Sequence, residues 1–374
     1  MEYRILSHTG TKVSTIGIGS GSIHGIDDGK TVALFDFAEE KGINFIDMAL
    51  SYPEPMERYG VALRGRREKF HLQMHLGITF ESGEYGRDYN LEAVKRSFET
   101  QLHKTGSDYA DTALFHCVDT LEDYNKLIDG GVFDYALAQK KAGVIRNLGF
   151  ASHTVDIANR FIATDKIDTF MFSINAAYDF DPAVYDELGE DSKSRDSLTV
   201  AQDRQRLFQE CAKRNIGITV MKAYGGGKLL EAKTSPFGRA MTATQCIQYA
   251  LDRPAVLSCM LGIRDKADLE AAVKLFDATP EELDYSFISN IRPKEMLGSC
   301  VYCNHCMPCP AGINIGQTHK FFDLYLAGDE MAKEHYFAME RRASDCTQCG
   351  VCESRCPFAV NVREKMETTQ QVMG

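Results

Sequence analysis

Along the first 280 residues, apolar runs of strand length alternate with segments whose apolar positions recur at helical spacing. Each strand candidate is followed by a helical segment that often stops at glycine. A short hairpin pattern, YRIL followed by TKVS, precedes them. Eight βα units over about 270 residues predict a closed (β/α)8 TIM barrel at residues 1–280. The strand candidates are VSTIGIG, NFIDMA, KFHLQMHL, YADTALFHC, IRNLGFASH, DTFMFSIN, IGITVMKAY and VLSCMLGI.

An open, doubly wound parallel sheet is the second fold that strand and helix alternation allows. The stretch GIGSG, Gly17 to Gly21, resembles the start of a dinucleotide-binding loop. It lacks the third spaced glycine, and no helical pattern follows it at once. The number of units therefore favours the barrel.

Polar residues stand at the ends of three predicted strands. In KFHLQMHL, apolar residues alternate with His71, Gln73 and His75. This polar set should face the barrel axis with His75 nearest the mouth, because successive side chains of a strand point to opposite faces. TIM barrels carry their chemistry at the C-terminal ends of the strands. We therefore predict that four polar groups converge there, namely Asp47, Tyr52, His75 and His116.

Two other interpretations of these residues stay open. One inward histidine in a barrel is more often a hydrogen-bonded core residue than a catalyst, and Asp47 alone could cap a loop. A mononuclear metal held by His75, His116 and Asp47 is the sharper alternative, since imidazole and carboxylate are common metal ligands.

Eight of the twelve cysteines form two runs near the C-terminus, and each run ends in Cys-Pro. A C-x2-C-x2-C segment can place three thiolates at three corners of an iron–sulfur cube, and the cysteine before proline serves the other cluster in two-cluster ferredoxins. The runs resemble a bacterial-type two-cluster ferredoxin. The predicted ligand sets are Cys300, Cys303, Cys306 and Cys356 for one 4Fe-4S cluster, and Cys346, Cys349, Cys352 and Cys309 for the other.

Between the runs, THKFFDLYLAG and DEMAKEHYFAMERR carry apolar residues at helical spacing. We therefore predict that residues 281–374 form a small, mainly α-helical ferredoxin-like domain. Zinc is the alternative metal, but it leaves the third cysteine of each run unexplained. Disulfides are a further alternative that conflicts with the cytoplasmic setting predicted below.

DMALSY, the opening hairpin, DYADTALFHC, GVIRNLGFASH and FSIN together resemble the aldo-keto reductase family, and the cysteine runs resemble its ferredoxin-fused members. The resemblance implies a carbonyl reductase that uses NADP(H) or NAD(H). It implies Tyr52 as the proton donor, supported by Asp47 and by His116. The family's lysine falls on His75, where this sequence departs from the pattern.

The departure at His75 changes the expected pH dependence of the reaction. A histidine can replace the lysine cation only when it is protonated, and its reference pKa is about 6.5 against about 10.4 for lysine. We hypothesise that His75 and Asp47 form an ion pair beneath Tyr52. Reduction should then slow as pH rises through the histidine pKa.

The resemblance also implies where a nicotinamide cofactor would lie. Ser152 and Asn175 would bind the carboxamide, and Tyr224 would stack on the ring. Arg264 and Lys266 favour NADP slightly, although exposed cations near a helix start are commonly just solvated. The expected phosphate contacts are Gly225, Gly226, Gly227, Gly262 and Arg264, and the sequence GGGKLL does not have the spacing of a P-loop.

Two enzymatic functions and one non-enzymatic function follow from these patterns. The first is a nicotinamide-dependent reductase of a small carbonyl compound with a ferredoxin-like domain for electron transfer. The second is a reductase that takes electrons from a ferredoxin- or flavodoxin-type partner through the clusters, with or without flavin. The third is a docking scaffold for an electron carrier. Nicotinamide delivers two electrons and a cluster passes one, so the patterns alone do not decide among them.

Composition narrows the partners further. A net charge of −11 and the lack of a basic run interleaved with aromatics argue against nucleic acid. No apolar run reaches the roughly 18 residues of a spanning helix, and no secretory signal is visible. We expect a cytoplasmic protein without a membrane partner.

Overall fold

A computed structural model of the chain describes residues 1–6, 8–23, 26–50, 53–80, 86–177, 179, 202–290, 298, 300, 306–326, 331–356 and 359–374. These residues belong to two compact units. The first comprises Met1–Ile174, Arg206–Ala223 and Ala250–Thr279, and the second comprises Asn175–Gln205, Tyr224–Tyr249 and Pro280–Gly374. The domain boundary expected between residues 280 and 281 stays a prediction.

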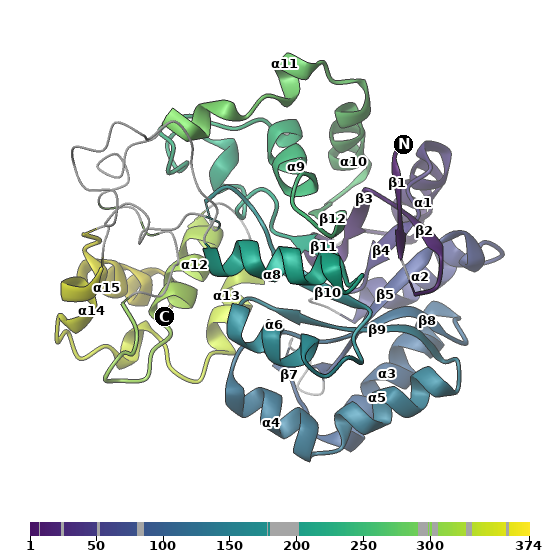
Figure 1. Cartoon of the computed structure of the whole chain (residues 1–374), viewed down its shortest axis with the longest axis horizontal. Coiled ribbons are helices and arrows are strands. Elements are labelled where there is room, and N and C mark those ends of the chain that lie inside the picture. Colours follow the sequence, from purple (N-terminus) through teal and green to yellow (C-terminus); the bar gives the residue numbers. More distant parts are fainter. Residues whose placement is uncertain are drawn as a thin grey trace. The chain divides into compact units, whose positions relative to one another are not determined.

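Eight parallel strands close into a barrel in the first unit (Figure 1). Every neighbouring pair is parallel, and β12 pairs with β3 to complete the ring. The predicted TIM barrel is thus confirmed, and the open sheet is excluded because a closed ring has no edge. The strands are β3 (Ile16–Gly19), β4 (Phe45–Asp47), β5 (His71–Leu76), β8 (Ala110–Phe115), β9 (Ile145–Ser152), β10 (Thr169–Ser173), β11 (Gly217–Met221) and β12 (Val256–Gly262).

A hairpin closes the N-terminal end of the barrel. Its strands, β1 (Tyr3–Leu6) and β2 (Thr11–Ser14), pair antiparallel as the sequence predicts. Leu6 and Val13 are fully buried and pack against residues at the starts of barrel strands, among them Phe45 and Leu257. These buried apolar side chains fill one end of the barrel. Polar residues that could take part in a reaction are therefore expected at the opposite end.

Two long helices of the first unit begin and end at the residues that helix capping favours. The side chain of Asp27 accepts from the amide of Lys30 at the start of α1, and Asn90 caps α3 in the same way. Both helices end at a glycine in the left-handed region, Gly42 and Gly106. The helices wholly in this unit are α1 (Asp28–Lys41), α2 (Glu54–Leu63), α3 (Leu91–Thr105), α4 (Leu121–Asp129), α5 (Val132–Lys141), α6 (Val155–Ile162) and α10 (Lys266–Ala272), while the residues of α8 (Gln202–Lys213) and α9 (Ala243–Leu251) are divided between the two units.

Register places the ends of three consecutive strands side by side. Asp47 of β4 is paired with Gln73 of β5, and Leu76 of β5 is paired with Phe115 of β8. Asp47, His75 and His116 therefore stand near the C-terminal ends of adjacent strands. A small antiparallel pair, β6 (Ile78–Thr79) with β7 (Gly86–Arg87), follows β5.

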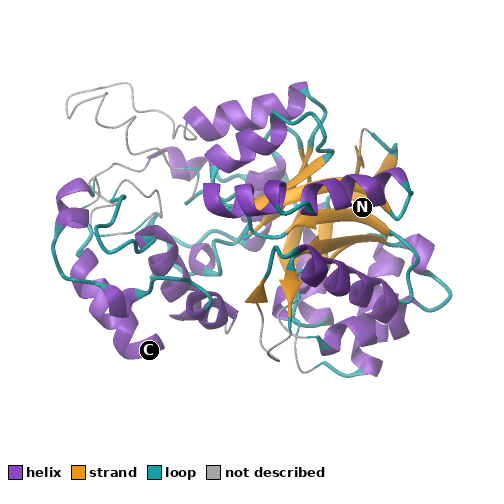
Figure 2. Ribbon diagram, turned by 90° about the horizontal axis from the view of Figure 1, so that it is seen from below, coloured by secondary structure: helices purple, strands orange, loops and turns teal. Residues whose placement is uncertain are grey.

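The regular elements in the described part of the second unit are helices, whereas the strands of Figure 2 belong to the first unit. The core of the second unit contains two tightly buried residues of its C-terminal helices, Tyr336 and Met366, together with Cys306 and Cys352. The predicted helical, ferredoxin-like region is confirmed. Its helices are α12 (Ile315–Leu326), α13 (Met331–Phe337), α14 (Val351–Arg355) and α15 (Val362–Met373).

Among the described residues, no helix combines the length and the apolar character that crossing a membrane requires.

Candidate active site and cluster site

Three of the four residues predicted at the barrel mouth form a hydrogen-bonded chain. Nε2 of His75 lies 2.8 Å from Oδ1 of Asp47, and Nδ1 of His75 lies 2.8 Å from Nδ1 of His116. The chain is almost free of solvent, with 3 %, 0 % and 4 % of Asp47, His75 and His116 exposed. Tyr52, the fourth residue, lies outside the described residues.

The carboxylate of Asp47 has a second donor. The amide of Gln73 donates to the same Oδ1 over 2.7 Å, and the hydroxyl of Thr219 on β11 donates to Gln73 over 3.4 Å. Gln73 therefore reaches across the barrel interior, as the alternation of β5 predicts. Because Oδ1 accepts from an amide, the short contact with His75 is best satisfied when the imidazole also donates.

Side chains outside the ring of barrel strands hold the backbone of both histidines in place. The side chain of Gln101 on α3 accepts from the amide of His75 and donates to its carbonyl oxygen. The hydroxyl of Tyr89 donates to the carbonyl oxygen of His116 over 2.7 Å. These neutral contacts hold the two rings in place without adding charge.

A metal ion fits this site poorly. Both ring nitrogens of His75 are already used in hydrogen bonds, one to Asp47 and one to His116. No set of three histidine, cysteine, aspartate or glutamate side chains in the described parts of the chain could hold a single ion. The geometry therefore favours a proton-sharing chain over a mononuclear centre.

The sequence patterns did not point to a second carboxylate and imidazole pair at the same end of the barrel. Nδ1 of His153, directly after β9, lies 2.9 Å from Oδ2 of Asp119, which follows β8. Burial alone would raise the pKa of Asp119, but the charge and hydrogen bonds of His153 outweigh it and hold that pKa well below its usual range. The signal available was their position: Asp119 and His153 follow strand ends, as His116 does.

Three of the expected nicotinamide contacts belong to the first unit. The hydroxyl of Ser152 is 3.2 Å from Asp119. A Cβ added to Gly262 would lie 3.0 Å from the hydroxyl of Ser22, so only glycine fits there without a shift. Arg264 is largely exposed and makes a two-pronged ion pair with Asp268, one turn along the chain.

The other expected nicotinamide contacts belong to the second unit. Asn175 is buried and accepts from the amide of Ala177, and Tyr224 is half-buried. Three successive glycines have positive φ angles of 59°, 68° and 85°, a backbone path that side chains rarely adopt. A Cβ on the first of them would lie 3.2 Å from Leu229. These glycines are Gly225, Gly226 and Gly227.

The turn after these glycines is tied to the helices of its own unit. Nζ of Lys228 lies 3.2 Å from the Asp323 carboxylate on α12, and Nζ of Lys365 on α15 lies 2.7 Å from it. His319, one turn before Asp323, is fully buried, and neither ring nitrogen has a hydrogen-bond partner. Burial and the nearby Lys365 cation lower the pKa of His319 to about 3.

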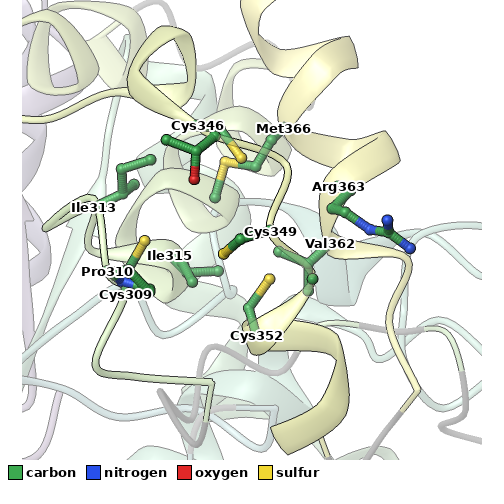
Figure 3. A pocket seen from close by; sticks show the side chains of 12 residues that line it. Cys309, Pro310, Ile313, Ile315, Cys346, Cys349, Cys352, Val362, Arg363 and Met366 are labelled. Carbon is green, nitrogen blue, oxygen red and sulfur yellow. The ribbon is translucent and has the colours of Figure 1, made fainter.

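Four cysteines from both runs line one cavity in the second unit. Figure 3 shows their sulfur atoms around a common space, with Ile315, Val362 and Met366 beside them. Cys309 lines this cavity together with three cysteines of the other run; its assignment as their fourth cluster ligand stays a prediction. Four thiols facing an apolar cavity suit a cubic iron–sulfur cluster. The four are Cys309, Cys346, Cys349 and Cys352.

The cysteines around the cavity differ in their local environment. The amide of Val351 at the start of α14 lowers the pKa of Cys349, because it stabilises the thiolate. Burial raises the pKa of Cys352.

The second predicted ligand set is described only in part, because Cys303 lies outside the described residues. Cys306 is buried in the helical core, and Cys300 and Cys356 pack against the same core. The guanidinium of Arg355, next to Cys356, donates to the carbonyl oxygen of Pro308, next to Cys309. The two runs are thereby held together at their proline ends.

Comparisons with known proteins agree with both parts of the chain. The model of the aldo/keto reductase family matches residues 15–241, and that of a 4Fe-4S dicluster domain matches residues 296–360. The chain is 28 % identical over 183 residues to YqkF, an uncharacterized oxidoreductase of Bacillus subtilis, covering 47 % of this chain and 56 % of that one. It is 29 % identical over 174 residues to the L-galactose dehydrogenase of Arabidopsis thaliana, covering 42 % and 50 %. The chain thus spans about half the length of these curated relatives.

Solved structures share the barrel. The holo form of the aldo-keto reductase AKR11C1 from Bacillus halodurans superposes with a TM-score of 0.59 at 20 % identity, over 78 % of this chain and 96 % of that one. The Pseudomonas aeruginosa protein PA4992 gives 0.56 at 24 % identity, over 75 % and 96 %. At this level of identity, the likeness supports the fold alone.

Proposed function

Because the chain belongs to the aldo/keto reductase family and carries a 4Fe-4S dicluster domain, we propose that its barrel catalyses the NAD(P)H-dependent reduction of a small carbonyl compound. The observation that carries the proposal is the chain from Asp47 through His75 to His116, buried at the mouth of the barrel. Its relatives among oxidoreductases support the same class of reaction.

Each residue has a task in the proposed reaction. Tyr52 gives a proton to the carbonyl oxygen, and His116 binds that oxygen as a second donor. His75 and Asp47 take the place of the family's lysine, with Nε2 of His75 2.8 Å from Oδ1 of Asp47. A bound NAD(P)H supplies the hydride that reaches the carbonyl carbon.

The residues expected to hold the cofactor fit the task unequally. Gly225 to Gly227 leave room for backbone approach to a pyrophosphate, and Ser152 and Asn175 offer groups that match an amide. Arg264 and Lys266 each pair with a carboxylate one turn on, Asp268 and Glu270. These ion pairs remove the reason for preferring NADP to NAD.

For the second unit we propose two 4Fe-4S clusters, with Cys309 completing the set that surrounds the cavity. The apolar lining of the cavity suits a cluster, because it keeps water from the sulfurs and influences the reduction potential. Electron transfer through these clusters to or from a protein partner belongs to the same proposal.

The proposed function is tested by equilibrium titration of the anaerobically purified holoprotein with NADPH and with NADH, followed by fluorescence. We expect saturable binding of NADPH or NADH. An excess of the corresponding oxidised nucleotide should abolish it by competition. If neither binds while reduced ferredoxin or flavodoxin supports reduction of a small substrate, the nicotinamide proposal is wrong and the cluster-fed alternative replaces it. If neither binds and no substrate or electron carrier is turned over, the barrel is the docking scaffold.

A further inference from the structure

A largely buried ion-pair link joins the glycine turn, Gly225 to Gly227, to two helices of the second unit. Nζ of Lys228, the next residue, lies 3.2 Å from the carboxylate of Asp323 on α12. Nζ of Lys365 on α15 lies 2.7 Å from the same carboxylate. The exposed fractions of the side chains are 16 %, 15 % and 20 % for Lys228, Asp323 and Lys365. Because water and salt screen such a group less than an exposed pair, the link constrains the parts that it joins.

Both helices of the link begin at the cavity lined by the four cysteines. Ile315 is the first residue of α12, Val362 is the first residue of α15, and both line the cavity. Figure 3 shows these two side chains beside the sulfur atoms. Asp323 lies about 12 Å along its helix from Ile315, and Lys365 lies about one turn from Val362. A change at the cavity that shifts either helix start is therefore carried along a rigid element to the carboxylate.

The glycine turn depends on contacts outside its own loop for its position. Its backbone hydrogen bonds include those from the amides of Gly227 and Leu229 to the carbonyl oxygen of Tyr224. Such bonds shape the turn without attaching it to α12 or α15. The side chain of Lys228 makes that attachment, and Phe237, later in the same loop, packs against the helical core. Successive glycines lose much conformational freedom on ordering, so an external attachment matters most here.

We propose that Lys228 and Asp323 are positioning residues that couple the glycine turn to the cysteine cavity. When the four thiols are ligated, the starts of α12 and α15 are fixed, and the helices in turn fix the carboxylate of Asp323, Lys228 and the turn. The pyrophosphate of a dinucleotide then meets a turn that is already ordered, so it binds more tightly. The inference rests on the proposed function and deepens it, because nucleotide binding and cluster retention then strengthen each other by the same factor.

A direct contact between Lys228 and a phosphate is the alternative, and it predicts the opposite sign. If the ammonium group binds the nucleotide, the carboxylate of Asp323 competes for it, and Asp323→Asn tightens nucleotide binding. If the ammonium group positions the turn, Asp323→Asn weakens nucleotide binding. The direction of change in one dissociation constant therefore separates the two roles of Lys228.

The first test is a double-mutant cycle on the dissociation constants of NADPH and NADH, measured by fluorescence with anaerobically purified protein. Cys309→Ser removes a ligand of the cavity cluster, and Asp323→Asn removes the link. Each substitution alone should weaken binding about tenfold. Together they should weaken it little more than either one does, whereas independent effects would multiply to about 100-fold. Multiplying effects would contradict the inference.

Two controls accompany the cycle. Arg341→Gln breaks an exposed ion pair with Asp345 in the same unit, so its combination with Cys309→Ser should bind nucleotide as Cys309→Ser does alone. Removal of both clusters from the unsubstituted chain with an iron chelator should weaken binding at least as much as Cys309→Ser. Iron per chain is measured in every sample.

Hydrogen exchange of the turn gives a second readout that needs no nucleotide. Peptides covering residues 224–230 should exchange faster after cluster removal in the wild type, because the turn loses its attachment to fixed helices. In Asp323→Asn and in Lys228→Met they should exchange fast with or without the clusters. Lys228→Arg keeps the cation and should behave as the wild type. Exchange in the wild-type turn that ignores cluster removal would overturn the inference.

The two readouts distinguish the inference from the proposed function. If exchange of the turn responds to the clusters through Asp323 but neither nucleotide binds the wild type, the proposed function fails and the coupling stands. If a nucleotide binds the wild type, Cys309→Ser and Asp323→Asn with one dissociation constant, the coupling fails and the proposed function stands. Tighter binding by Asp323→Asn assigns Lys228 to the nucleotide itself and also overturns the inference.

Discussion

The barrel site and the cysteine cavity are built in opposite ways. At the barrel mouth, Asp47, His75 and His116 are satisfied by one another, and neutral amides hold them in place. Around the cavity of the second unit, four sulfurs stand among aliphatic side chains and gain little from one another. The first site is arranged by hydrogen bonds between its own side chains, whereas the second is proposed to supply ligands to a cluster that would hold the sulfurs in place.

This difference predicts different responses to single substitutions. A change in the barrel chain should alter rates and pH profiles while the fold persists, because the ring of strands is held by its own ladders. A change among the cysteines should remove a whole cofactor, because binding of a metal group and local folding are coupled. The four predictions below test this contrast, from the largest expected effect to the smallest.

Cys309→Ser should cost the protein one cluster. Iron per chain should fall from about eight to about four, with a matching loss of visible absorbance, because the set of Cys346, Cys349 and Cys352 loses its fourth thiolate. Cys246→Ala, at a buried cysteine outside both runs, is the control and should keep all iron. Unchanged iron in Cys309→Ser would contradict the crossed assignment.

His75→Ala should lower kcat/KM about 100-fold, which corresponds to about 3 kcal/mol of transition-state stabilisation. The alanine removes the hydrogen-bond partner that links Asp47 to His116. Steady-state kinetics on the best carbonyl substrate give the value, and His71→Gln is the matched control. A decrease in kcat/KM of less than about threefold would mean that the hydrogen-bonded residues Asp47, His75 and His116 have only a structural role.

Asp323→Asn should destabilise the second unit by about 2 kcal/mol. The asparagine leaves Lys228 and Lys365, both largely buried, without their shared carboxylate. Denaturant unfolding monitored at the cluster absorbance measures the loss. Arg341→Gln, which breaks the exposed pair with Asp345 in the same unit, should change stability by less than about 1 kcal/mol. Equal effects of the two substitutions would contradict this assignment.

The barrel should lose stability as pH falls below about 6.5, because the buried side chain of His71 is neutral in the folded protein and is protonated first in the unfolded chain. Burial lowers the pKa of His71 from 6.5 to about 4, so the unfolded chain binds the proton more readily than the folded one. The stabilisation of the folded barrel by neutral His71 is complete above about pH 6.5 and declines toward pH 4. Between pH 7.5 and pH 5.5, the loss in unfolding free energy amounts to about 1 kcal/mol.

The check on His71 is the pH dependence of the unfolding free energy in wild type and in His71→Gln. The wild-type value should fall more steeply over that interval, by about the amount above. Parallel curves would show that His71 is protonated to the same extent in the folded and unfolded states.

Much of the fold could be predicted because it is written in short-range patterns. The eight apolar runs correspond to the eight strands of the ring, and glycines mark the ends of α1 and α3. The meeting of Cys309 with the second run was also foreseeable, since the Cys-Pro ending is a local signal. Asp47, His75 and His116 could be placed together because strand ends meet at one rim of a barrel.

Contacts between side chains far apart in the sequence could not be predicted from the patterns, because they depend on the direction in which each side chain points. The contact between Nδ1 atoms of His75 and His116 requires two particular ring orientations, and no spacing encodes these. The pair of Asp119 and His153 links two different loops, and the link from Lys228 to Asp323 spans nearly a hundred residues. The ion pair of Arg264 with Asp268 was readable at i,i+4 spacing, and it weakens the argument for NADP.

The most direct test of the account follows the hydride itself. The holoprotein is incubated with a panel of small aldehydes and ketones and with NADPH or NADH that carries deuterium at both C4 positions of the nicotinamide, and the alcohols are examined by mass spectrometry and NMR. The account predicts one deuterium on the carbinol carbon, with transfer greatly slowed in Asp47→Asn and His75→Ala. Alcohol formed without deuterium, at a rate set by a reduced iron–sulfur or flavin donor, would contradict it.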